Sequence, residues 1–65
     1  MNRWTVTRKG VEGPGTGGQY TYSTRADSAE EAVEKTAAKA GRPLSRINRG
    51  GTRLDPTPTD VTRVN

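Results

Sequence analysis

The sequence predicts an α+β fold of the ββαββ type, in which one alanine-rich helix packs on one face of a small antiparallel sheet. Two segments alternate between apolar and polar residues with the period of a strand. A helix-like segment with start and stop signals follows them, and a Gly-Gly pair then separates two further short segments. We therefore assign residues 1–55 to a single ββαββ domain and residues 56–65 to an extended, Pro/Thr-rich C-terminal tail.

The length of the chain limits the size of its core. A chain of 65 residues forms one domain at most, because it buries only about 60% of the surface that its unfolded form exposes. It contains five Val, two Leu, one Ile and no Phe, so aliphatic side chains alone cannot fill a core. Aromatic side chains must supply much of the buried area. The candidates are Trp4, Tyr20 and Tyr22.

The first two strands are predicted at residues 3–8 and 19–25, where Trp4 and Val6, and then Tyr20 and Tyr22, alternate with polar residues. Between them, residues 9–18 hold five Gly and one Pro, which is typical of a flexible hairpin loop. Gly13, Gly15 and Gly18 match the spacing of a phosphate-binding G-x-G-x-x-G motif. In that motif a helix follows the glycines, whereas here a strand follows, so we interpret the segment as a plain loop.

A helix is predicted from Ser28 to about Ala40. Ser28 and Glu31 have the spacing of a capping box, which satisfies free backbone N–H groups at a helix start. Acids in the early turns and lysines in the late turns suit the helix dipole, and Gly41 and Pro43 end the segment. The stripe expected to face the sheet comprises Ala29, Ala32, Val33, Ala37 and Ala40.

A second hairpin is predicted around Gly50 and Gly51, which suit a two-residue turn with positive φ at both positions. In that register Ile47 lies opposite Leu54 on the helix side. On the other face, Arg46 lies opposite Asp55 and Asn48 opposite Arg53. The tail that follows has two further prolines and no sustained period, with Val61 and Val64 as its expected anchors.

Composition excludes several kinds of chemistry. Without Cys or His the chain lacks disulfides, the usual zinc ligands, the commonest general base and the familiar nucleophilic triads. Asp27, Glu30, Glu31 and Glu34 are explained by the start of the helix rather than by a metal or a catalytic pair. We therefore expect no enzyme activity, cofactor or metal. No apolar run is long enough for a membrane span, so a cytoplasmic location is expected.

Charge gives the functional hypothesis. The net charge is +4, and eight of the eleven cations are Arg, a composition typical of a GC-rich bacterial genome or its phages. If the apolar residues of the strands face the helix, the other face is rich in Arg and Thr and can contact phosphates and base edges. The expected contacts are Arg3, Lys9, Arg25, Arg46, Asn48, Arg49 and Arg53.

Two functions remain open from the sequence. The first is a nucleic-acid-binding accessory protein of a phage or bacterium, with DNA or RNA as the partner. The alternative is a protein-binding adaptor or inhibitor that docks on an acidic protein surface. A basic face that serves only solubility would have the same composition. Contiguous basic charge favours the first function, whereas an exposed apolar patch with a polar rim favours the second.

Overall fold

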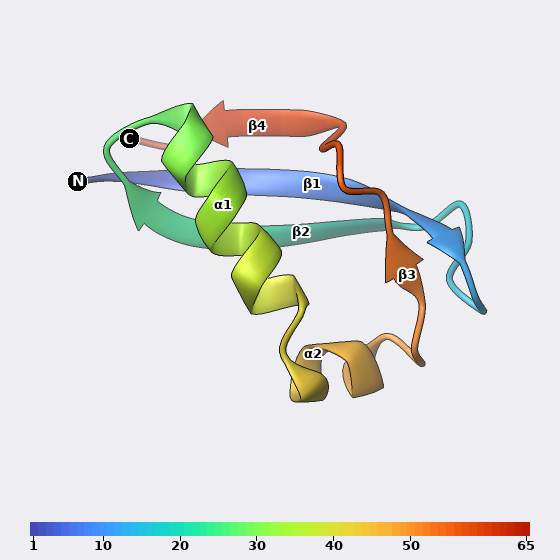
Figure 1. Ribbon diagram of the computed structural model, residues 1–65. Coiled ribbons are helices and arrows are strands. Elements are labelled where there is room, and N and C mark those ends of the chain that lie inside the picture. The colour runs from blue at the N-terminus through green and yellow to red at the C-terminus, as the bar shows by residue number, and fades with distance from the viewer.

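The α+β class is confirmed by a computed structural model, which describes residues 1–65 (Figure 1). Four strands and two helices follow one another in the order ββααββ. Their bounds are β1 Asn2–Glu12, β2 Gln19–Ala26, α1 Ala29–Ala40, α2 Pro43–Asn48, β3 Arg53–Leu54 and β4 Asp60–Arg63. Neither helix is long and apolar enough to cross a lipid bilayer.

Strand β1 is the centre of the sheet, and all of its pairings are antiparallel. Strand β2 pairs along one side of it, with Val6 opposite Tyr22. The other side is shared by two strands. β4 pairs with the first half of β1, where Val61 lies opposite Val6, and β3 pairs with the second half, where Leu54 lies opposite Gly10 (Figure 1).

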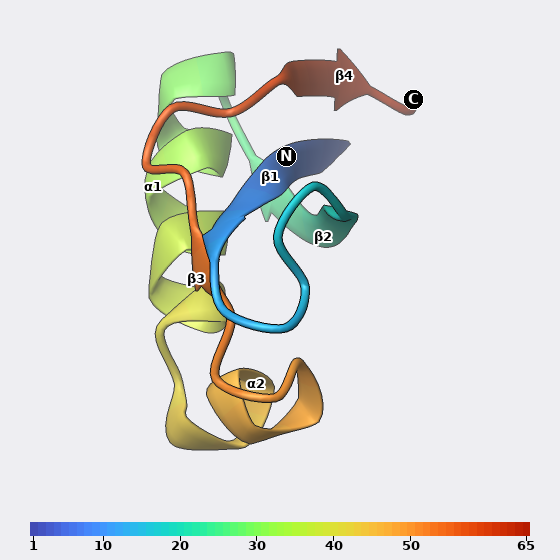
Figure 2. The same cartoon turned by 90° about the vertical axis from the view of Figure 1, so that its right-hand side faces the viewer.

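Helix α1 covers one face of this sheet and leaves the other face without a helix (Figure 2). Its start uses the predicted capping residues. The backbone N–H of Glu31 donates to Ser28 Oγ at 3.2 Å, and the backbone N–H of Asp27 donates to Glu31 Oε1 at 2.9 Å. These contacts satisfy donors that a helix start leaves without internal partners.

The buried stripe of α1 is narrower than the sequence predicts. Its buried residues are Ala32, Thr36 and Ala40, at spacings of four. Ala29 and Ala37, which were expected on the stripe, are exposed. A single helix resting on a small sheet buries only the line of residues nearest the strands, so an alanine beside that line stays in solvent.

The apolar core lies between the first half of β1 and the start of α1. Val6, Ala26 and Ala32 are fully buried, and other partly buried apolar side chains, including Trp4, pack against them. Trp4 also donates its indole N–H to the carbonyl of Ala26 at 3.0 Å. The predicted inward face of the first two strands is therefore confirmed, since the even-numbered residues of both strands turn toward the helix.

The predicted second hairpin is wrong. Residues 43–48 form α2, and Ile47 is 72% exposed instead of packing opposite Leu54. Gly50 and Gly51 do have positive φ, but they end a helix: the N–H of Gly51 donates to the carbonyl of Arg46 at 2.8 Å, and that of Gly50 to Ile47 at 3.0 Å. This is the Schellman arrangement, which needs the same left-handed backbone as a hairpin turn.

The C-terminal segment was expected to be an extended tail, but residues 60–63 form strand β4 of the sheet. Val61 is half-buried against the core, as expected of an anchor, whereas Val64 is 54% exposed. The two prolines precede the strand, so they do not remove its ladder hydrogen bonds. Both termini consequently lie at the same end of the sheet (Figure 1).

The glycine-rich loop is anchored rather than free. Strand β1 runs on to Glu12, and the N–H of Gly10 donates to the carbonyl of Gly18 at 2.8 Å. The N–H of Gly15 donates to Thr52 Oγ1, also at 2.8 Å. A Cβ at Gly15 would overlap the hydroxyl of Tyr20, so any other residue there would displace the end of that side chain. The strand expected after the glycines is β2.

Two lysines of α1 reach across to the outer edge of β2. Lys39 Nζ donates to the carbonyl of Ser23 at 2.6 Å, and Lys35 Nζ donates to the carbonyl of Arg25 at 3.0 Å. Lys35 also lies 3.5 Å from Glu31. The late helical lysines therefore do more than complement the helix dipole, since they partner backbone groups that no strand pairs.

Candidate anion-binding surfaces

The face of the sheet that α1 leaves uncovered carries only polar side chains over its paired residues. We call these ten residues the open face. They are Arg3, Thr5, Thr7 and Lys9 of β1, Gln19, Thr21, Ser23 and Arg25 of β2, and Asp60 and Thr62 of β4. Most of them are exposed, and the hydroxyls of Thr7 and Thr21 hydrogen-bond to each other at 2.8 Å at its centre. The open face is thus a hydroxyl-rich surface.

The cations of the open face have no ion-pair partners. Arg3 and Arg25 lie directly opposite each other at one end, and Lys9 lies opposite Gln19 at the other. The ion pairs of the chain involve other cations. The single acid of the face, Asp60, accepts a hydrogen bond from the Thr62 hydroxyl at 2.6 Å. Like charges directly opposite each other destabilise a sheet. An anion bound between the two arginines would remove that repulsion.

The structure divides the predicted contact residues into separate groups. Arg3, Lys9 and Arg25 do share the open face. Arg46 and Asn48 belong to α2, and Arg53 belongs to β3 and lines a hollow beside α1, so their expected placement on the open face is wrong. The cause is the missing hairpin: without a strand at residues 46–48, strand alternation does not apply there.

Arg49 holds the protein together rather than projecting into solvent. Its Nε donates to the carbonyl of Thr52 at 2.7 Å, and its Nη1 donates to the carbonyl of Ala40 at 2.8 Å. The same Nη1 lies within hydrogen-bond distance of the hydroxyls of Ser45 and Tyr22. These bonds join the end of α1, α2 and β2, so most of its donors are already used.

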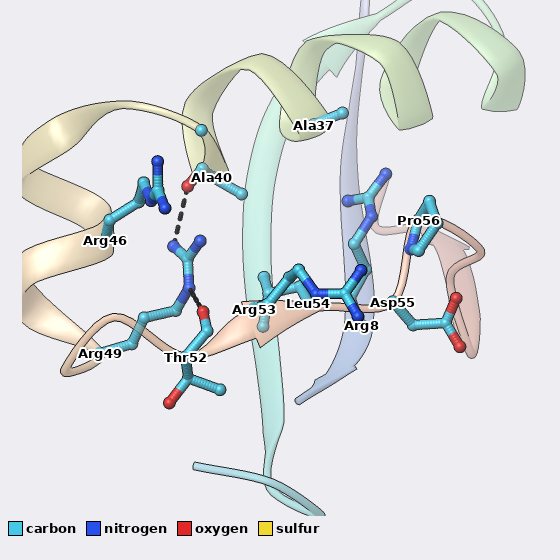
Figure 3. Close-up of a pocket in the computed structure, with 11 residues that line it drawn as sticks. Arg8, Ala37, Ala40, Arg46, Arg49, Thr52, Arg53, Leu54, Asp55 and Pro56 are labelled. Carbon is cyan, nitrogen blue, oxygen red and sulfur yellow. Dashed lines mark hydrogen bonds between the residues drawn. The ribbon is translucent and has the colours of Figure 1, made fainter. Parts of the chain in front are cut away.

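A pocket of about 340 Å³ lies on the helix side of the sheet, between the end of α1, α2 and β3 (Figure 3). We call it the arginine pocket. Guanidinium groups from three elements line it, and Asp55 is the only carboxylate in its lining. The arginines are Arg8 of β1, Arg46 and Arg49 at α2, and Arg53 of β3.

Arg8 is the main residue that the sequence-based site prediction missed. It is only 3% exposed, and its guanidinium donates to Thr36 Oγ1 at 3.1 Å and to the carbonyl of Val33 at 3.0 Å. Burial lowers the pKa of this guanidinium from its ordinary value. Strand alternation carried the signal, because Arg8 has the same parity as Trp4 and Val6 and therefore turns toward the helix.

Both surfaces carry several cationic and hydroxyl side chains. No three acidic side chains gather where they could hold a metal ion. The acids at the start of α1 serve its backbone and a lysine, and Glu12 pairs with Arg53 at 3.7 Å. What the two surfaces offer is hydrogen-bond donation from fixed cations and hydroxyls.

No protein-family model, no curated protein and no solved structure matches this chain.

Proposed function

We propose that this chain is a small nucleic-acid-binding accessory protein that contacts a duplex through the open face. One observation carries the proposal: a complete sheet face without a helix, made of polar side chains, with unpaired cations at both of its ends. Phosphate contacts supply most of the affinity of such proteins, and they require cations that no acid of the chain already pairs with. Its role is binding without catalysis.

The dimensions of the open face suit a duplex groove. Arg3 and Lys9 are six residues apart on one strand, which at about 3.3 Å per residue separates them by roughly 20 Å. A major groove is about 12 Å wide, so the two ends of the face can reach phosphates on either side of it. Three neighbouring strands make the face about 10 Å across. The sheet can therefore enter a groove with its strands running across the groove and its hydroxyls toward the bases.

The chemistry of the open face predicts weak sequence preference. The side chains at its centre are Thr and Ser, whose hydroxyls donate and accept and so tolerate every base pair. The arginines, which could read guanine, lie at one end, where the phosphates are expected. We therefore expect affinity that depends strongly on salt and weakly on sequence.

The test removes the three open-face cations together, as Arg3→Gln, Lys9→Gln and Arg25→Gln. Binding to a labelled duplex is followed by fluorescence anisotropy from about 50 to about 300 mM salt. Each lost phosphate contact lowers the slope of log affinity against log salt by about 0.9, so three contacts reduce it by nearly 3. Circular dichroism should show the native helix content in the variant, because all three side chains are exposed.

The matched control removes three exposed cations from the helix side, as Arg42→Gln, Arg46→Gln and Arg53→Gln. It changes net charge equally, so its salt slope should stay close to that of the wild type. An equal loss in both triple variants would mean that only net charge matters, which would contradict the proposal. A wild-type chain that does not bind duplex even at low salt would end it.

A second candidate function is protein binding through α2. Leu44 and Ile47 are 69% and 72% exposed and stand three residues apart on this helix, between arginines. No acid occurs from residue 35 to residue 54, so an acidic partner with an apolar ridge would fit here. Failure of the wild type to bind duplex would favour this function, and Leu44→Ser with Ile47→Ser would then weaken the association.

A further inference from the structure

We propose that the arginine pocket binds a single phosphate group, either as inorganic phosphate or as the terminal phosphate of a monoester. The pocket lies on the opposite side of the sheet from the open face, so this inference does not rest on duplex binding. It explains a feature that the fold by itself does not, namely why four guanidinium groups line one hollow with a single carboxylate (Figure 3).

Two of the four arginines are fixed and lack a counter-ion. Arg8 and Arg49 donate only to carbonyl and hydroxyl oxygens, and neither takes part in an ion pair. Arg8 is almost fully buried, and a buried charge without a partner of opposite sign is costly. Neutral acceptors orient these cations without cancelling their charge. An anion in the pocket would cancel it.

The other two arginines are available to touch a ligand. Arg46 makes no side-chain hydrogen bond or ion pair within the chain. Arg53 lies 3.7 Å from Glu12, but both side chains are largely exposed, and such a pair contributes little. Asp55, the one acid of the pocket, accepts the backbone N–H of Thr57 at 2.9 Å. Positive charge therefore exceeds negative charge in the lining.

The end of α1 would repel an anion if its carbonyls were free, but donors of the chain occupy three of the last four. The N–H of Gly41 donates to the carbonyl of Ala37 at 3.0 Å, that of Arg42 donates to Lys39 at 3.3 Å, and the Arg49 side chain covers Ala40. The negative end of the helix dipole is thereby partly neutralised where α1 borders the pocket. This leaves the guanidinium groups to set the sign of the potential.

The arrangement of the arginines favours phosphate over carboxylate. A carboxylate is planar and pairs with one guanidinium fork, whereas a phosphate monoester presents three oxygens in different directions and carries nearly two charges near neutral pH. The pocket collects its guanidinium groups from β1, α2 and β3, that is, from different directions. Several cations around one site suit a compact dianion.

The experiment titrates the full chain with inorganic phosphate at constant ionic strength, with chloride replacing phosphate in the reference. Binding is measured by calorimetry and by amide and Arg side-chain NMR shifts. Saturable shifts are expected at Thr52, Gly41 and the side chains of Arg8 and Arg49. Arg46→Gln and Arg53→Gln should each weaken binding about tenfold, because each removes a charge-assisted hydrogen bond to the anion.

The matched control is Arg63→Gln, which removes one exposed cation of β4 that belongs neither to the open face nor to the pocket lining. It should leave phosphate affinity unchanged. Adenosine monophosphate and a short oligonucleotide with and without a 5′-phosphate identify the source of the group. Equal binding of the two oligonucleotides, together with saturable binding of inorganic phosphate, would assign the site to free phosphate. Shifts that chloride reproduces, or equal losses in the control, would overturn the proposal.

Discussion

The two ends of α1 rest on the sheet in different ways. At its start, apolar side chains pack together around Val6, and the Trp4 indole donates to the Ala26 carbonyl beside them. At its end the contacts are polar: Arg8, Arg49 and Thr52 direct their donors and acceptors inward. The start of the helix is therefore stabilised by removal of apolar surface from water. Its end is stabilised by hydrogen bonds, and each buried polar group there needs a partner.

This difference shows how a chain with eight large aliphatic residues can still order its whole length. The apolar residues suffice for one end only. At the other end, long Arg side chains span the gap between elements with their stems and bond to backbone carbonyls with their heads. Three mutational or pH experiments test how far each end depends on its own kind of contact.

The largest effect is expected from Arg49→Ala, which breaks the polar end. It removes three donated hydrogens, one from Nε and two that Nη1 shares among three acceptors, at about 1 kcal/mol each, so the free energy of unfolding should fall by about 3 kcal/mol. Urea unfolding measures it. Arg46→Ala, an exposed neighbour, should cost within about 0.5 kcal/mol. Equal stability of the two variants would show that the polar network contributes nothing.

Arg49→Lys provides a second measurement of how much the Arg49 hydrogen bonds contribute to stability, and it can be used if Arg49→Ala does not fold. Lysine keeps the charge but cannot donate in two directions from one plane, so the variant should fall between the wild type and Arg49→Ala. A wild-type stability in Arg49→Lys would assign the effect to charge rather than to the guanidinium geometry.

An intermediate effect is expected from Val6→Ala, which breaks the apolar end. Val6 is completely buried and touches both sides of the core, so its truncation should cost about 2 kcal/mol. Val64→Ala is the control, because that side chain is 54% exposed and should change stability little. A smaller loss for Val6→Ala than for its control would mean that the apolar cluster is not the core.

The smallest effect concerns acid sensitivity at the start of α1. The hydrogen bond from the Asp27 N–H, with help from Lys35, holds the pKa of Glu31 below its ordinary value. A lowered pKa in the folded state stabilises the protein above the unfolded value, about 4.3, and this contribution is lost as pH falls through the folded value. Glu31→Gln should remove this dependence in unfolding measured from pH 6 to pH 3.

The sequence predicts the apolar end better than the polar end, for a physical reason. Alternation in β1 and β2 and the cap at Ser28 are local signals, and each of them is confirmed. Burial of Thr52 depends instead on Gly15, which is 37 residues away and leaves no local pattern. The Gly50–Gly51 pair was misleading because a hairpin turn and a Schellman end need the same backbone angles.

The candidate sites follow the same division. Strand alternation correctly groups Arg3, Lys9 and Arg25 on one face. The same rule places Arg8 inside, although this residue was not among the predicted contacts. It could not predict the arginine pocket, whose members come from elements separated by long stretches of chain and are brought together only by tertiary packing.

The two lysines that reach the β2 edge also affect how the protein behaves at high concentration. An edge strand with free carbonyls is a template on which a second molecule can add its own strand and start a fibril. Here the ammonium groups of Lys35 and Lys39 occupy two of those carbonyls and place positive charge along the edge. Molecules that approach through this edge repel one another before their backbones can pair. Acetylation of both lysines would remove this protection and favour aggregation.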